Sequence, residues 1–391
     1  MVKPFQFARL PLILFGCGKR SELPGLIRGF GTKALLVTRG RSFIDSADGK
    51  TLLKTLLDKK ILYHTVVINS EPSPRMVDEA VSAAAEFVPD VVTAIGGGSV
   101  LDAGKAISAM LRAEGSVIEY LEGVGTWDHP GGKVPFIALP TTSGTGSEAT
   151  KNAVISSIGK EGFKRSLRHD NFVPDIALVD PELTVSCPPE ITAASGMDCF
   201  TQLVEAYLSV KSNEYTDALA IEGLKAIKRS LRAVNRDGND IAARTDMSFA
   251  ALTSGICLAN TGLGAVHGFA SSIGGMYKIP HGVICGTLMA GANELNVKKI
   301  RKGYGNPEAL KKYTTLGQLF LDEKGRNEDY YIDGFIHYLR LLTDELHLPG
   351  LKKYGIKEGD LQKICSQTEI KNNPAKLETS DLMEILLERF I

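Results

Sequence analysis

Short apolar runs rich in β-branched residues alternate with helical patterns over the first half of the chain. Four such runs predict buried strands, at 33–38, 63–68, 90–95 and 134–139. Helical spacing follows the first run and covers 76–87 and 100–111, and two further strand-like pieces lie at 152–158 and 176–179. Because strands separated by helices are joined by right-handed crossovers, the pattern predicts a mostly parallel sheet.

The pattern changes to purely helical in the second half. Helical periodicity with few β-branched runs covers four segments, 190–210, 217–234, 241–259 and 266–276. Pro188 and Pro189 mark a boundary, because a residue before proline avoids the helical region. We therefore predict an α/β domain at 1–184 and an all-helical domain at 185–391. We expect the charged, glycine-punctuated segment 298–326 to lie on the surface.

Composition limits the binding partners and the cellular compartment that we expect for the protein. The 391 residues include 45 basic and 45 acidic side chains, so the formal net charge is zero. A neutral chain favours neither a nucleic-acid partner nor a polybasic contact with a membrane. The six cysteines form no CxxC pair, which favours free thiols in a reducing compartment. The apolar patch at 10–15 is too short for a signal sequence or a membrane span, so we expect a cytoplasmic protein.

Two loops of small residues follow predicted strands. The first, Gly96-Gly97-Gly98-Ser99, lies between a strand and a helix, where parallel sheets bind ligands and helix N-termini attract anions. It matches neither a GxGxxG nor a Walker A motif, and alone it fits a plain strand–helix turn equally well. The second loop, at 141–148, follows the fourth strand, and its hydroxyl-bearing candidates are Thr141, Thr142, Thr145 and Ser147. Two such loops in one sheet predict a ligand that contains a diphosphate.

Arg39 and Arg41 flank a glycine directly after the first predicted strand. Sites that prefer NAD usually place an acidic residue near this point for the ribose 2′-hydroxyl, whereas a 2′-phosphate needs a cation. Arginine binds phosphate through two parallel hydrogen bonds. The pair therefore favours NADP over NAD, and the alternative is two solvated surface charges.

Three residues are candidates for a metal site. His267 and His281 lie fourteen residues apart, each followed by glycine in a context of apolar or small residues. Asp198 lies near the start of a predicted helix, where a charge is costly unless it is paired or bound to metal. One carboxylate and two imidazoles suit a catalytic divalent ion with an open position. From residue types alone, hydrogen-bonded core side chains remain the alternative.

Together these segments resemble the iron-containing (group III) alcohol dehydrogenase family. The matching segments are GGGSVLDAGK at 96–105, TTSGTGSE at 141–148, DP at 180–181, GMD at 196–198, VEAY at 204–207 and IPHG at 279–282. The resemblance implies a dinucleotide-binding α/β domain and a helical domain in a dehydroquinate synthase-like architecture. It also implies reversible hydride transfer between the nicotinamide C4 of NADP or NAD and a small alcohol or aldehyde bound to a divalent metal. A homodimer or a larger homo-oligomer is expected.

The resemblance also implies roles for individual residues. The first glycine loop with Asp102 would contact the pyrophosphate and the nicotinamide side of the cofactor. Thr141, Thr142 and Ser147 would line the cofactor, and Lys164 matches a cofactor-side lysine. The matching metal ligands, which we also take as the catalytic centre, are Asp198, His267 and His281.

Two positions depart from the family pattern. Gln202 stands where the family has a fourth ligand, a histidine four residues after Asp198 and on the same helix face. Its amide oxygen would bind weakly or only hold a water, so we expect either Fe²⁺ or Zn²⁺. Ser271 stands where many members have a histidine proposed to relay a proton. A metal-independent maleylacetate-type reductase and a non-catalytic NADP-binding protein therefore remain alternative functions.

Overall fold

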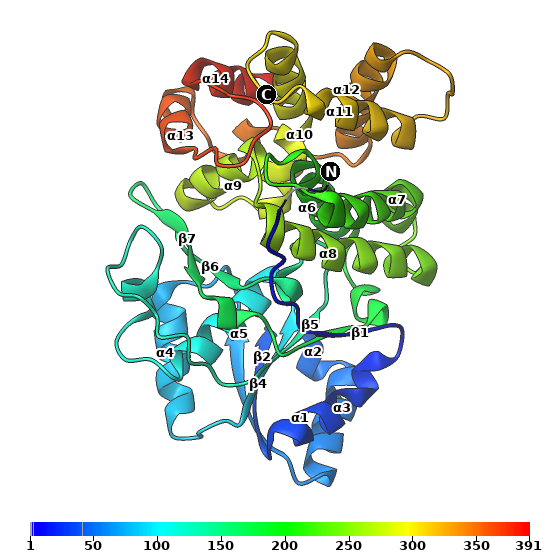
Figure 1. Ribbon diagram of the computed structural model, residues 1–391. Coiled ribbons are helices and arrows are strands. Elements are labelled where there is room, and N and C mark those ends of the chain that lie inside the picture. The colour runs from blue at the N-terminus through cyan, green and yellow to red at the C-terminus, as the bar shows by residue number, and fades with distance from the viewer. Residues whose placement is uncertain (1, 3, 41) are drawn as a thin grey trace. The chain divides into compact units, whose positions relative to one another are not determined.

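Six strands of the first half form one parallel sheet in the computed structural model, which describes residues 2, 4–40 and 42–391 (Figure 1). The strand order is β1-β8-β5-β4-β2-β3, and every neighbouring pair is parallel. The bounds are β1 Leu12–Phe15, β2 Lys33–Arg39, β3 Leu62–Ile68, β4 Val91–Gly96, β5 Phe136–Pro140 and β8 Ile176–Val179. The predicted parallel sheet is confirmed.

Helices cover both faces of the central strands. Every residue of β4, β5 and β8 is buried, and because successive side chains of a strand point to opposite faces, both faces must be covered. The helices of this part are α1 Leu23–Phe30, α2 Ser42–Asp45, α3 Ala47–Asp58, α4 Pro74–Ala85 and α5 Gly98–Met110. The carboxyl ends of β2, β4 and β5 lie side by side, since Thr38 is in register with Ile95, and Gly96 with Pro140.

Two strands and two α-helices of this half were not predicted. Strand β1 lies at the sheet edge and pairs with β8, so its partner is far away in the sequence. Strand β7, Phe163–Arg168, is rich in basic residues and forms a separate two-stranded sheet with β6, Asn152–Ser157. Helices α1 and α2 are the other two.

The second half is helical, as predicted. Its helices are α6 Pro189–Leu208, α7 Glu214–Arg236, α8 Ile241–Thr261, α9 Ala265–Met276, α10 His281–Arg301, α11 Glu308–Phe320, α12 Glu328–Glu345, α13 Leu361–Gln367 and α14 Thr379–Glu388. Helix α6 is buried along most of its length, and α7, α8 and α10 pack against it (Figure 1).

The expected exposure of 298–326 is wrong for α11. Ala309, Tyr313, Leu316 and Phe320 recur at helical spacing and are buried in the core of the helical part. The charged residues of the segment occupy the other face of the helix, which is why the composition of the segment suggested a surface loop.

The contacts divide the chain into two units. The α/β unit consists of 8–157 and 164–187, and the helical unit consists of 188–391 with 158–163 and the start of the chain up to Phe7. The main change of unit follows Cys187. Residues 158–163 form the tip between β6 and β7, so the helical unit includes a piece of chain from within the first half.

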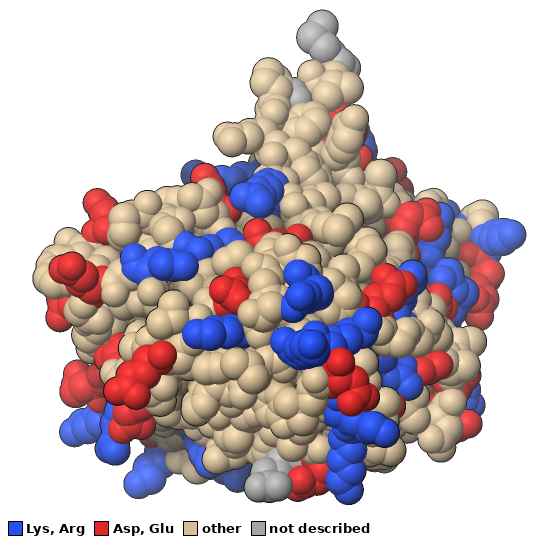
Figure 2. All heavy atoms as spheres, turned by 90° about the horizontal axis from the view of Figure 1, so that it is seen from below, with Lys and Arg blue, Asp and Glu red and all other residues tan. Residues whose placement is uncertain are grey.

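Surface charge is mixed on the face shown in Figure 2, where basic and acidic side chains lie close to one another. Within the described residues no single helix is long and apolar enough to cross a membrane. Helices α8 and α9 reach that length and composition only as a pair, with a bend of 98° between them. All six cysteines lie in the described part of the chain, and the structure holds each of them as a thiol.

Candidate metal centre

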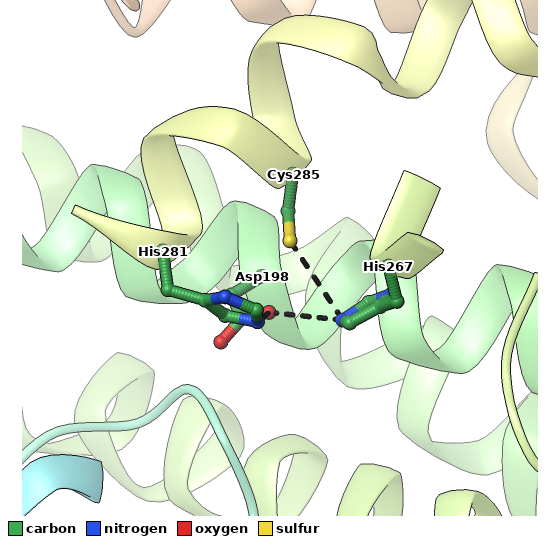
Figure 3. Close-up of side chains that lie close together, drawn as sticks. All are labelled: Asp198, His267, His281 and Cys285. Carbon is green, nitrogen blue, oxygen red and sulfur yellow. Dashed lines mark hydrogen bonds and ion pairs between the residues drawn. The ribbon is translucent and has the colours of Figure 1, made fainter. Parts of the chain in front are cut away.

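Four potential metal donors converge from three helices of the helical unit (Figure 3). Asp198 comes from α6 and His267 from α9, whereas His281 is the first residue of α10 and Cys285 lies one turn later. One donor atom from each residue lies within 4.8 Å of the others. The structure therefore brings together the three predicted ligands and adds a thiol that the sequence analysis missed.

The glycines beside the histidines allow these helices to approach. A Cβ atom at Gly282 would lie 2.1 Å from the carbonyl oxygen of Ala194 on α6, so only glycine fits there. A Cβ at Gly268 would lie 2.4 Å from the carbonyl oxygen of Glu369. Gly282 thus fixes the start of α10, and with it His281, directly against the helix that carries Asp198.

The donor distances suit a small divalent cation. His267 Nε2 lies 3.3 Å from Asp198 Oδ1, and His281 Nε2 lies 3.6 Å from the same oxygen. Cys285 Sγ lies 3.7 Å from His267 Nε2. A tetrahedral ion with bonds of about 2.0–2.3 Å holds its donors about 3.3–3.8 Å apart. These residues therefore fit a metal ion without a large rearrangement.

The electrostatics of the cluster favour positive charge at its centre. Burial raises the pKa of Asp198, but His281 and His267 more than offset this and hold the pKa at about 2. Burial lowers the pKa of His267, but Cys285, Asp198 and Glu205 raise it well above its ordinary value. The ionised Asp198 carboxylate thus lies beside the His267 imidazole, which is stabilised as a cation, and a divalent ion would supply the positive charge in place of that proton.

Glu205 orients His267 from behind. Its Oε2 lies 2.7 Å from Nδ1 of His267, and its Oε1 accepts a hydrogen bond of 2.8 Å from the N–H of Val266. This contact leaves Nε2 directed at the cluster, as carboxylates commonly do for histidines that bind metal. No role for Glu205 was predicted from the sequence. The available signal was its position two helical turns after Asp198, on the same face of α6.

The two positions that depart from the family pattern have defined contacts. Gln202 is buried, its side chain hydrogen-bonds to Asp198, and its Oε1 accepts a weak hydrogen bond of 3.5 Å from Ser254 Oγ. Ser271 is exposed on α9, and its hydroxyl donates to the carbonyl oxygen of His267 at 3.1 Å. Gln202 therefore adjoins the predicted ligand Asp198, and Ser271 lies one turn beyond His267.

The two predicted glycine and hydroxyl loops lie against each other in the α/β unit. The N–H of Thr141 donates to the carbonyl oxygen of Gly96. A Cβ atom at Gly97 would lie 3.1 Å from Thr142 Oγ1, and one at Gly98 would lie 2.6 Å from Thr145 Cγ2. The first turn of α5, which includes Ser99, thus meets the second loop at the carboxyl edge of the sheet, where parallel sheets bind dinucleotides.

Buried charges anchor the second loop to α5. Ser147 Oγ donates to Asp102 Oδ1 at 2.5 Å, and Lys105 Nζ donates to the carbonyl oxygen of Ser147 at 2.9 Å. Burial lowers the pKa of Lys105 to about 8 and raises that of Glu148 to about 7. Burial also raises the pKa of Asp102. Lys105 and Glu148 belong to the matching motifs but had no predicted role. The hydrogen bonds of Lys105 hold the loop in place, and Glu148 is buried within electrostatic range of Lys105.

The basic cofactor candidates have different surroundings. Both carboxylate oxygens of Glu71 accept hydrogen bonds of 2.8 Å from Lys164 Nζ, so the lysine is ion-paired within the α/β unit. Arg39 is exposed at the end of β2, one position beyond Thr38, which is in register with Ile95 of β4. Arg41 lies outside the described residues.

Comparison with known proteins identifies the family. The model described as iron-containing alcohol dehydrogenase matches residues 11–181, and the model of the C-terminal part of the Fe-containing alcohol dehydrogenase family matches 192–390. Alcohol dehydrogenase 4 of Saccharomyces cerevisiae is 33% identical over 90% of this chain and 88% of its own. NAD-dependent methanol dehydrogenase of Bacillus methanolicus is 34% identical over 96% of this chain and 97% of its own.

A solved structure agrees with both family models. The alcohol dehydrogenase from Oenococcus oeni superposes with a TM-score of 0.88 at 28% identity, covering 99% of this chain and 100% of that one. The family models together span nearly the whole sequence, and both the predicted ligands and the glycine loops lie within them. The chain therefore belongs to the iron-containing alcohol dehydrogenase family and is an oxidoreductase that transfers hydride between CH–OH groups and a nicotinamide dinucleotide.

Proposed function

We propose that this enzyme reduces small aldehydes, and oxidises the corresponding alcohols, at one divalent ion held by Asp198, His267 and His281. The carrying observation is the convergence of these three donors at distances that suit a metal ion. His281 is 26% exposed and His267 12%, whereas Asp198 is 2% exposed. The histidine side of the cluster is therefore the side from which a small substrate can enter.

The residues of the centre have separate roles in binding the ion and in orienting its ligands. A divalent ion in this site supplies a Lewis acid that polarises a carbonyl and lowers the pKa of an alcohol. Asp198 provides the negative charge that balances the ion, and Glu205 keeps His267 Nε2 directed at it. Without a histidine at position 271, we propose that protons pass through the Ser271 hydroxyl, water or ribose hydroxyls.

We also propose that the enzyme prefers NADP(H) to NAD(H), with the two loops and Lys164 on the cofactor side. The support is Arg39 at the carboxyl end of β2, next to the end of β4 where the first loop begins. Arg39→Asp should cost about 1.5–3 kcal/mol of NADPH binding, or about ten- to a hundredfold in affinity, and leave NADH binding nearly unchanged. Arg28→Asp, an equal charge change at an exposed position of α1, is the control. An unchanged cofactor preference in Arg39→Asp would contradict this part of the proposal.

Metal reconstitution tests the reaction itself. The apoprotein should reduce an aldehyde panel only after Fe²⁺ or Zn²⁺ is added, and His267→Ala should neither retain metal nor turn over. Turnover without metal would instead support a reductase of the maleylacetate type. Dinucleotide binding without turnover under any metal would support a non-catalytic NADP-binding protein.

The location and the assembly state are part of the same proposal. Six thiols, four of them buried, are compatible with a reducing cytoplasm. We propose a homodimer or a larger homo-oligomer, which light scattering of the purified enzyme tests directly. A single monomeric mass at micromolar concentration would contradict it.

A further inference from the structure

The Cys285 sulfur belongs to the donor cluster by its position. It lies 3.7 Å from His267 Nε2, and its side chain is fully buried. Figure 3 shows the thiol descending from α10 toward the imidazole of His267, with Asp198 and His281 beside it. The sulfur is thus one of four donor atoms that all lie within 4.8 Å of one another.

The backbone holds Cys285 rigidly in this position. His281 and Cys285 are four residues apart on α10, so their side chains lie on one face of the helix. The next residue, Gly286, packs so closely on α6 that a Cβ there would lie 2.7 Å from Met197 Cβ. The helix that supplies two donors is therefore fixed against the helix that supplies Asp198.

Gln202, the other candidate for a fourth donor, is engaged elsewhere. Its side chain hydrogen-bonds to Asp198, and its oxygen accepts a hydrogen bond from Ser254. The amide oxygen of Gln202 faces Ser254, and its nitrogen faces the Asp198 carboxylate. Gln202 therefore supports the ligand Asp198 and is not itself a donor. It does not present an oxygen to the ion.

We infer that Cys285 is the fourth protein ligand of the ion, which makes the centre an Asp/His/His/Cys site that prefers Zn²⁺ to Fe²⁺. This inference rests on the proposed function of the cluster as a metal site. The thiol loses its proton to water as the sulfur–metal bond forms, and thiolate favours the thiophilic ions Zn²⁺ and Co²⁺. Zn²⁺ accepts five ligands as well as four, so four protein donors do not exclude a substrate.

Cobalt provides a spectroscopic test that needs no turnover. The apoprotein loaded with Co²⁺ should show a sulfur-to-cobalt charge-transfer band in the near ultraviolet. The band should vanish in Cys285→Ser and Cys285→Ala. It should persist in Gln202→Ala and in Cys257→Ser, which alters a buried thiol that donates to the Thr216 carbonyl oxygen instead.

Zinc affinity provides the second readout. Chelator competition should show Zn²⁺ binding at least about 10–100-fold weaker in Cys285→Ala, because even residues that only support a ligand contribute that much. Fe²⁺ binding should weaken less, so the preference for zinc should fall. Circular dichroism identifies any variant that fails to fold, and Cys285→Ser then serves as the conservative replacement.

The outcomes separate this inference from the function on which it rests. If wild-type protein binds Co²⁺ without the charge-transfer band, or Cys285→Ala keeps it, Cys285 is no ligand although the metal site stands. If neither Co²⁺ nor Zn²⁺ binds to the folded wild type, the proposed metal-dependent function itself fails.

Discussion

Two carboxylates on α6 have different tasks at the metal centre. Asp198 faces the donor cluster, whereas Glu205 holds His267 through Nδ1 and the Val266 N–H. A histidine that shares the Nδ1 proton with a carboxylate presents Nε2 as the donor to the ion. The tautomer of His267 is thus set by a residue that does not face the ion.

Removing the Glu205 charge should weaken metal binding without removing a ligand. In Glu205→Gln, we expect Zn²⁺ affinity to fall about 10–100-fold, because the amide holds the imidazole less firmly and supplies no negative charge. Chelator competition measures the change. Glu214→Gln, in the first turn of α7, is the control and should bind zinc like wild type. Equal affinities in Glu205→Gln and Glu214→Gln would rule out the positioning role.

Glu148 makes folding stability depend on pH. Burial raises its pKa to about 7 from an ordinary value of 4.5, so the folded state holds the proton more tightly than the unfolded state. The free energy of unfolding should therefore decrease as the pH rises from about 4.5 to 7. Glu148→Gln should remove about 1–3 kcal/mol of this decrease.

Urea unfolding at several pH values measures the effect, and Glu86→Gln, an exposed change after α4, provides the control. The explanation fails if Glu148→Gln has the same pH slope as wild type between pH 4.5 and 7.

Local sequence patterns contain part of the site. Asp198, His267 and His281 were predictable because charged and imidazole side chains among small and apolar residues are costly without a partner. Cys285 was not, since a thiol in an apolar helix is as well explained by the core. A ligand role for Cys285 can be inferred only from its spacing from His281 together with the position of α9 beside α10. No local pattern in the sequence contains that position.

At the scale of elements, prediction succeeded where strands are buried on both faces. Such strands read as continuous apolar runs, and β2, β4 and β5 were found close to their observed bounds, as was the more exposed edge strand β3. Strand β1 is a four-residue piece of the apolar patch at 10–15 that forms a strand by pairing with β8, and the basic strand β7 has no apolar pattern and pairs with β6. Pairing between distant segments is what the local pattern omits.

The contact between the two loops predicts an order of effects among glycine variants. A Cβ at Gly98 would lie 2.6 Å from Thr145, whereas one at Gly97 would lie 3.1 Å from Thr142. Gly98→Ala should therefore displace the second loop and reduce NADPH affinity by tenfold or more, on the order of 1.4 kcal/mol. Gly97→Ala should have a smaller effect.

Fluorescence titration with NADPH measures both variants. Gly29→Ala, in α1 with open space around its Cβ position, is the matched control and should bind NADPH normally. Normal NADPH affinity in folded Gly98→Ala would show that the loops can separate without affecting the cofactor.

At the scale of the whole molecule, the residues proposed for the metal and those proposed for the cofactor lie in different units. The metal donors lie on α6, α9 and α10 of the helical unit, and both loops lie in the α/β unit. The change of composition near Pro188 is visible in the sequence. The assignment of 158–163 to the helical unit is not, because it rests on contacts with distant residues, such as the hydrogen bond from Gly159 N–H to the Gly275 carbonyl.

Each ligand should therefore protect its own unit against hydrogen exchange. At a hundred times its dissociation constant, Zn²⁺ should slow exchange in α6, α9 and α10 by up to about a hundredfold, or 2.7 kcal/mol. At a hundred times its own dissociation constant, NADPH should slow hydrogen exchange at 96–99 and 141–148 by a similar factor. Mass spectrometry of the exchanged peptides tests this, with His267→Ala as the control for zinc. Zinc-dependent protection that persists in His267→Ala would contradict the location of the metal.

The tip between β6 and β7 has a consequence for synthesis on the ribosome. The carbonyl oxygen of Lys160 accepts a hydrogen bond from Lys363 Nζ, 203 residues later in the chain. At about 5–20 residues per second, the second partner is made about 10–40 s after the first. The nascent chain must therefore carry this tip without its final contacts while most of the helical unit is still being translated.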